Sequence, residues 1–132
     1  MESKALSNIF EQFAQKYLQD VSDEVLEKYR QAPFRAPMIV ILVSTIKEHP
    51  KVPALEQMFS TAAAGQNILL ALNALGFGGI WRTGKFALNK EIGSFLELDA
   101  NQEVLGYLYI GTPTGDNKKI PQLDPKDFVK KL

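Results

Sequence analysis

The chain has 132 residues, the length of one domain, and 45% of them are hydrophobic, as in an ordinary globular protein. Fifteen Lys and Arg residues balance fifteen Asp and Glu residues, so the zero net charge offers no basic field for a nucleic-acid partner. The absence of cysteine excludes disulfides, thiolate nucleophiles and Cys-bound metal clusters, and the single histidine, His49, argues against a His-based triad or metal site. These observations predict a cytoplasmic protein whose chemistry, if it has any, comes from a cofactor.

Two helices are predicted before the first strand. Apolar side chains recur at helical spacing over residues 4–18, which predicts a helix with one buried stripe. A shorter helix is expected to start near Ser22, because serine can cap its free amides and acidic residues follow in the first turn. Pro33 and Pro37 then disfavour helix from residue 32 to residue 38.

The central part of the chain predicts a strand and a long helix. Residues 38–46 are nearly all apolar and rich in β-branched side chains, which indicates a strand covered on both faces. The polar loop 47–53 contains His49, which we interpret as a solvated loop histidine. Residues 54–75 are the longest helix candidate, and Gly76 is placed to end it. The apolar stretch within it, residues 62–75, is interrupted by polar residues and is too short to span a membrane. The small residues 62–65 at the centre of this helix would let another helix approach closely.

The last part of the chain predicts two further strands and two short helices. Residues 78–84 form a short strand or extended segment between glycines, and Asn89 is expected to cap a short helix. Residues 104–110 indicate a core strand, and 112–123 a polar connection that leads into a brief helix over 124–129. Alternating helices and strands predict a layered α-β domain, although two strong strands are few for a self-sufficient sheet.

One short segment carries residue types that suit a ligand. Trp81 offers a flat apolar surface, Arg82 offers donors to carbonyl or phosphate oxygens, and Thr83 adds a hydroxyl. Together they suit a planar ligand with a polar edge, although composition alone favours a core tryptophan beside a surface arginine. The glycine-rich run 76–79 follows a helix instead of preceding one, so it is no dinucleotide-binding loop. It is either a helix cap with a flexible turn or a place of close approach to a ligand.

Several segments, in order along the chain, resemble the nitroreductase family, and in particular its small YdjA-like NAD(P)H nitroreductase branch. They are the runs 32–37 and 49–53, the helix segment with Glu56 and Gln57, GFGGIWRTG at 76–84, LGYLYIGTP at 105–113, and residues 124–129. The resemblance covers nearly the whole chain from Ala32 onward, and the GFGGIWR and LGYLYIGTP runs are specific as a pair. It implies an α+β fold with three α-β-α layers.

The resemblance also implies an FMN-dependent oxidoreductase that works as a homodimer with the flavin at the subunit interface. Hydride would pass from NAD(P)H to the flavin and then to a nitroaromatic or quinone-like acceptor, so no catalytic side chain and no metal ligand are implied. The residues that match the family's flavin-contacting segment are Trp81, Arg82 and Thr83. The residues that match, more loosely, its nicotinamide-nucleotide segment are Ala71, Leu72, Asn73, Ala74, Leu75 and Gly76.

The sequence departs from the family at its N-terminal end. The family's Arg-Arg-Ser motif, whose basic side chains bind the FMN phosphate, and a later region that lines the flavin and adds a strand have no counterpart; the first arginine is Arg30. We therefore expect residues 1–132 to form a single, incomplete nitroreductase-like domain that corresponds to the C-terminal portion. The alternative function is a non-catalytic remnant that dimerises but binds flavin weakly or not at all. The helices that begin at Lys4 and Ala54 are expected to expose apolar faces, with the long helix as the seam between two subunits.

Overall fold

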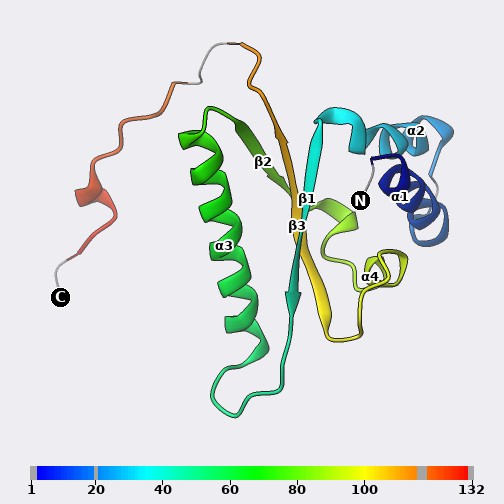
Figure 1. Ribbon diagram of the computed structural model, residues 1–132, viewed down its shortest axis with the longest axis horizontal. Coiled ribbons are helices and arrows are strands. Elements are labelled where there is room, and N and C mark those ends of the chain that lie inside the picture. The colour runs from blue at the N-terminus through cyan, green and yellow to red at the C-terminus, as the bar shows by residue number, and fades with distance from the viewer. Residues whose placement is uncertain (1–2, 20, 116–118, 131–132) are drawn as a thin grey trace.

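The computed structural model of the chain describes residues 3–19, 21–115 and 119–130. The chain folds into three layers, a three-stranded sheet between two layers of helices: α1, α2 and α4 lie on one face and α3 lies on the other (Figure 1). In chain order the elements are the helices α1 (Ser3–Tyr17) and α2 (Asp23–Gln31), the 3-10 helix η1 (Ala32–Arg35), the strand β1 (Met38–Thr45), the helix α3 (Ala54–Ala74), the strand β2 (Gly78–Arg82), the 3-10 helix η2 (Gly84–Phe86), the helix α4 (Ile92–Phe95), the strand β3 (Gln102–Gly111) and the 3-10 helix η3 (Pro125–Asp127). The predicted α-β-α layering is confirmed.

The strands lie in the order β1-β3-β2, and both neighbouring pairs are antiparallel. β3 is the central strand, and its residues 104–110 are all buried because helices cover both faces. β1 lies at an edge of the sheet, but its side chains still alternate between two covered faces, with Ile41 toward α1 and Leu42 toward α3. The prediction that both faces of this strand are covered is therefore confirmed.

An aromatic core fills the space between α1 and the sheet. The Phe10 and Phe86 rings stack with centroids 4.4 Å apart, and Tyr107 meets Phe10 edge-on at 5.3 Å. Phe13, one turn further along α1, is fully buried. The apolar stripe of α1 is thus covered within the chain. The expectation that this helix exposes its apolar face is wrong, because its 3.6-residue periodicity turns the stripe onto η2 and β3.

The Trp81 side chain, from strand β2, packs against the small residues at the centre of α3. Gly65 is buried, and a Cβ atom added there would lie 2.6 Å from both Leu42 Cδ1 and Trp81 Cζ3. The close approach expected of another helix is therefore made by the Trp81 indole instead. The face of α3 that is turned away from the sheet is exposed, as expected, and it carries apolar side chains interspersed with the polar Glu56, Ser60, Gln66 and Asn67. Three of its large side chains are more than half exposed: Leu55 (57%), Phe59 (60%) and Leu70 (59%).

Two helix ends form as the sequence predicts. α3 stops at Gly76, whose φ of +82° lies in the left-handed region that glycine adopts without strain. The Gly76 amide donates to the Asn73 carbonyl (3.1 Å) and the Phe77 amide donates to the Leu72 carbonyl (2.8 Å), which satisfies the last carbonyls of the helix. At the start of α2, the Ser22 hydroxyl accepts from the Val25 amide at 3.4 Å.

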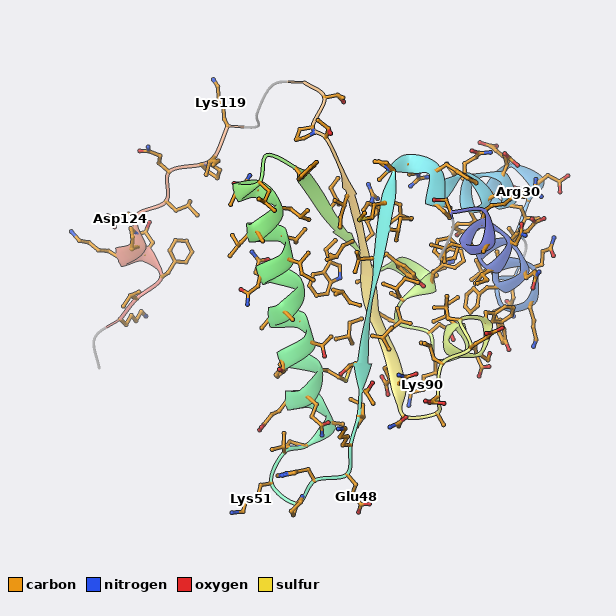
Figure 2. All side chains as sticks on the ribbon, in the orientation of Figure 1. Arg30, Glu48, Lys51, Lys90, Lys119 and Asp124 are labelled. Atoms are coloured by element: carbon orange, nitrogen blue, oxygen red, sulfur yellow. The ribbon has the colours of Figure 1, made fainter. Side chains whose placement is uncertain are left out.

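The C-terminal segment lies beyond α3, apart from the three layers (Figure 1). Its described residues 119–130 are all exposed, and Lys119 and Asp124 stand well away from the sheet (Figure 2). The helix predicted over 124–129 is only the single 3-10 turn η3, started by the Asp124 carboxylate, which accepts from the Lys126 amide at 2.9 Å. In the described part of the chain, no helix is both long and apolar enough to cross a membrane.

Candidate functional site

A cavity of about 500 Å³ opens between the helical layer and the segment that links β2 to η2. Tyr107 and Tyr109 of β3 line it from the sheet, α2 and η1 form one wall, and residues 81–86 form the other. Small-molecule sites in proteins enclose about 300–1,000 Å³ and combine apolar surface with a few convergent polar groups. The cavity has the size and lining of such a site.

β2 sends its two candidate ligand residues to opposite faces of the sheet. Arg82 pairs in register with Tyr107, so its side chain lies on the cavity face, whereas Trp81 points toward α3. The Trp81 indole rests against the buried Gly65 and against Gly106, and its N–H donates to the Leu105 carbonyl at 3.3 Å. Trp81 therefore borders the cavity with its main chain, and its side chain belongs to the core. Its neighbours in sequence, Arg82 and Thr83, are exposed at the cavity.

Positive charge is concentrated around the cavity. Among its lining residues that the structure describes there is no carboxylate, and four are basic: Lys28, Arg35, Arg82 and Lys85. All four are exposed, and within the described residues none of them joins an ion pair. Because the whole chain has zero net charge, this is a local excess of positive charge, which favours an anionic ligand.

Two tyrosines supply the polar atoms on the sheet side of the cavity. Burial raises the pKa of Tyr109, and the positive charges of Arg35 and Arg82 oppose that rise because they favour the phenolate. The two guanidinium groups, from different layers of the fold, therefore act on the same hydroxyl. Burial also raises the pKa of Tyr107, whose hydroxyl donates to the Phe86 carbonyl at 2.7 Å and so ties η2 to β3.

The residues predicted to contact the nicotinamide nucleotide lie elsewhere. Residues 71–76 form the C-terminal end of α3 and the turn after it, on the other face of the sheet, and none of them lines the cavity. Five of the six are exposed, while Leu72 packs into the core under α3. The structure thus keeps the two predicted groups of ligand residues apart within one chain.

Sequence reasoning missed the other three basic residues of the cavity and Tyr109. Arg35 lies in the run 32–37 that carries the family resemblance, but nothing local to that run indicates a ligand. Lys28 lies on α2, where a basic residue in the last turn already complements the helix dipole. Only the packing of α1 and α2 onto the sheet brings these side chains opposite β2.

Comparison with known proteins places the chain in a family. Residues 2–112 match the Nitroreductase family. The chain belongs to the nitroreductase family. The Escherichia coli (strain K12) protein named "Putative NAD(P)H nitroreductase YdjA" is 36% identical over 110 residues, which are 81% of this chain and 59% of that protein. The chain therefore spans less than two thirds of this relative.

Solved structures share the fold. A nitroreductase-like family protein from Bacillus cereus superimposes with a TM-score of 0.68 at 18% identity, over 98% of this chain and 65% of that one. The NADPH:FMN oxidoreductase of Vibrio harveyi, solved in complex with NAD+, gives a TM-score of 0.64 at 21% identity, over 99% of this chain and 55% of that one. The nitroreductase-like α+β fold predicted from the two sequence runs is confirmed.

Proposed function

We propose that the chain is the flavin-binding portion of an FMN-dependent oxidoreductase that passes hydride from NAD(P)H to nitroaromatic or quinone-like acceptors. The observation that carries this proposal is the basic cavity to which Arg82 and Thr83, the residues matched to the family's flavin segment, are exposed. Membership of the nitroreductase family supports it. So do the names of the relatives, one an NAD(P)H nitroreductase and one an NADPH:FMN oxidoreductase.

The basic residues around the cavity offer donors to the phosphate of FMN, in place of the family's Arg-Arg-Ser motif, which has no counterpart in this sequence. A phosphate needs charge-assisted donors, and Arg82 presents a planar set of N–H groups at the cavity. Tyr29 and Tyr109 add flat apolar surface with a hydroxyl at one end. The Trp81 indole is held in the core, so we assign the contact of Trp81 with the flavin to its main chain.

FMN, when bound, supplies the hydride chemistry, and the protein supplies binding and orientation. In this proposal Arg82 donates hydrogen bonds to FMN and lowers the energy of negative charge on it, and Thr83 adds a hydroxyl as a further donor or acceptor. Residues 71–76 are proposed, more loosely, to contact the nicotinamide nucleotide. Because FMN supplies the hydride chemistry in this proposal, no side chain at the cavity has to act as a nucleophile or general base.

We further propose a homodimer in which the exposed face of α3 meets a second copy. This seam lies on the other side of the sheet from the basic cavity, so it departs from the flavin at the subunit interface that the family resemblance implies. Leu55, Phe59 and Leu70 give this face large exposed apolar side chains, and large exposed apolar surface often marks a protein–protein contact. The 59% coverage of the YdjA relative supports treating residues 1–132 as one nitroreductase-like domain that corresponds to the C-terminal portion of that protein. A cytoplasmic location stays a prediction.

Uptake of FMN by the purified protein tests the proposed function. We expect flavin absorbance in the protein fraction or saturable quenching of flavin fluorescence on titration, and NAD(P)H oxidation when a nitroaromatic or quinone is added. Arg82→Ala should weaken FMN binding at least about tenfold, since a hydrogen bond to a charged group contributes about 1.5–3 kcal/mol. Lys51→Ala, which removes a positive charge from the loop at the far end of α3, is the matched control (Figure 2). A colourless protein that takes up no added FMN would instead support the non-catalytic remnant.

A further inference from the structure

The wall of the cavity opposite Arg82 is built around a fixed turn that carries Arg35. Pro33, within η1, is fully buried, and Ala32 before it is only 9% exposed. On the other side of the turn, Pro37 lies so close to β3 that a Cβ atom added at Gly111 would come within 3.0 Å of its Cδ. Because the backbone is anchored on both sides, the Cα atom of Arg35 is held in a fixed position near the end of β3. The Arg35 side chain itself is exposed.

The helix that precedes this turn is also held in place. The Ser7 hydroxyl donates to the Arg30 carbonyl at 2.7 Å, and the Arg30 guanidinium donates to Glu11 (2.7 and 3.0 Å) and to Glu27 (2.7 Å). Figure 2 places Arg30 in the helical layer, and its charge is taken up by these two carboxylates. Lys28, on the same helix, lines the cavity instead. α2 thus has one arginine that serves packing and one lysine that adds charge to the cavity.

The Arg82 wall is equally well defined. Arg82 is fixed by its pairing with Tyr107, and η2, which follows it, is tied to β3 by the hydrogen bond from Tyr107 to Phe86. Arg35, Arg82 and Tyr109 all line this cavity, and the positive charges of both arginines oppose the rise in the pKa of Tyr109 that burial causes. The fold therefore brings two arginines, 47 positions apart in the sequence, to the lining of one cavity.

We propose that Arg35 is a second phosphate-binding residue of this cavity, and that Arg35 and Arg82 hold one phosphate group from two layers of the fold. Two planar guanidinium groups match phosphate oxygens with directed hydrogen bonds, while Lys28 and Lys85 act as mobile point charges. This inference deepens the proposed function and rests on it where the phosphate is that of FMN. The same chemistry accepts a free phosphate, so the two sources are separate arms of the test.

Arg35 should then distinguish FMN from riboflavin, which lacks the phosphate. The test compares wild type, Arg35→Ala, Arg35→Lys and the Lys51→Ala control by fluorescence titration with both flavins, and by thermal unfolding with inorganic phosphate. We expect Arg35→Ala to weaken FMN binding about tenfold or more and to leave riboflavin binding unchanged. Arg35→Lys should fall between the two, because lysine keeps the charge and loses the bidentate geometry. Circular dichroism of each variant confirms that it is folded.

The outcomes separate this inference from the proposed function. If wild type binds neither flavin but is stabilised by phosphate, and Arg35→Ala is not, the phosphate site stands and the flavin function fails. If Arg35→Ala binds FMN like wild type, or loses FMN and riboflavin equally, Arg35 is not a phosphate-binding residue. Absence of any response of wild type to FMN and to phosphate overturns both the inference and the proposed function.

Discussion

Gly106 and Trp81 determine how closely α3 approaches the sheet. Gly106 has a φ of +156°, and a Cβ atom there would collide with the Trp81 indole nitrogen and lie 3.0 Å from the Arg82 carbonyl. The indole in turn fits against α3 because Gly65 has no side chain. A glycine on each side of one tryptophan thus fixes the position of β2, and with it the position of Arg82.

Replacing Gly106 by alanine should destabilise the protein by about 2–6 kcal/mol, since a strained backbone and an overpacked core each cost about 1–3 kcal/mol. Urea unfolding followed by tryptophan fluorescence measures the loss. Gly76→Ala is the matched control: its φ is also positive, but no atom lies within 4 Å of the added Cβ. The control should lose only about 1–2 kcal/mol from the backbone. Equal losses in the two variants would show that Trp81 is not packed against Gly106.

At the scale of elements, local patterns predicted where helices and strands begin and end. The cap at Ser22, the stop at Gly76 and the apolar run of β3 depend on neighbours in sequence, so they could be read from the sequence. The order of strands could not be predicted, because β3 pairs with both β1 and β2 across long intervening segments, and no local pattern shows which strand lies at the centre. Local chemistry likewise indicated Arg82 as a ligand residue. It could not indicate Arg35, which reaches the cavity through tertiary packing alone.

The junction of η2 with β3 depends on the Tyr107 hydroxyl. Tyr107→Phe should cost about 1–3 kcal/mol near pH 8, because the Phe86 carbonyl loses its buried partner. The folded-state pKa of Tyr107 is raised above its unfolded value of about 10, so only the unfolded chain ionises this group as the pH rises through 10. The stability that depends on protonated Tyr107 is therefore complete below pH 10 and is lost above it, by up to about 1.4 kcal/mol per pH unit.

Urea unfolding of wild type and Tyr107→Phe at several values between pH 8 and pH 11 tests this dependence. The stability difference between the two proteins should shrink above about pH 10, since phenylalanine cannot ionise. Curves that stay parallel across this range would contradict the assignment of Tyr107 as a buried, protonated anchor for η2. Tyr29→Phe, which removes another hydroxyl at the same cavity, serves as the comparison variant.

The two sides of the sheet differ in the surface that they expose. The basic cavity lies on the side of the helical layer, and the exposed apolar face of α3 lies on the other side of the sheet. The C-terminal segment adds exposed apolar side chains beyond α3, among them Ile120 (88%) and Phe128 (70%). With zero net charge, little long-range repulsion keeps copies of the chain apart. If copies of the chain associate as proposed, we therefore expect the contact to lie on the α3 side of the molecule.

We expect wild type to sediment at about twice its 14.7 kDa chain mass, with the α3 face buried between two copies. Leu70→Glu should shift the protein to the monomer mass, because burying an unpaired carboxylate in an apolar interface costs far more than leaving it in water. The fold should survive this change, since Leu70 is 59% exposed. Leu88→Glu is the control, placed on the loop before α4, where the leucine is 72% exposed. Wild type that stays at the monomer mass over a wide concentration range would refute the dimer. A dimer that persists in Leu70→Glu would assign the contact to a surface other than α3.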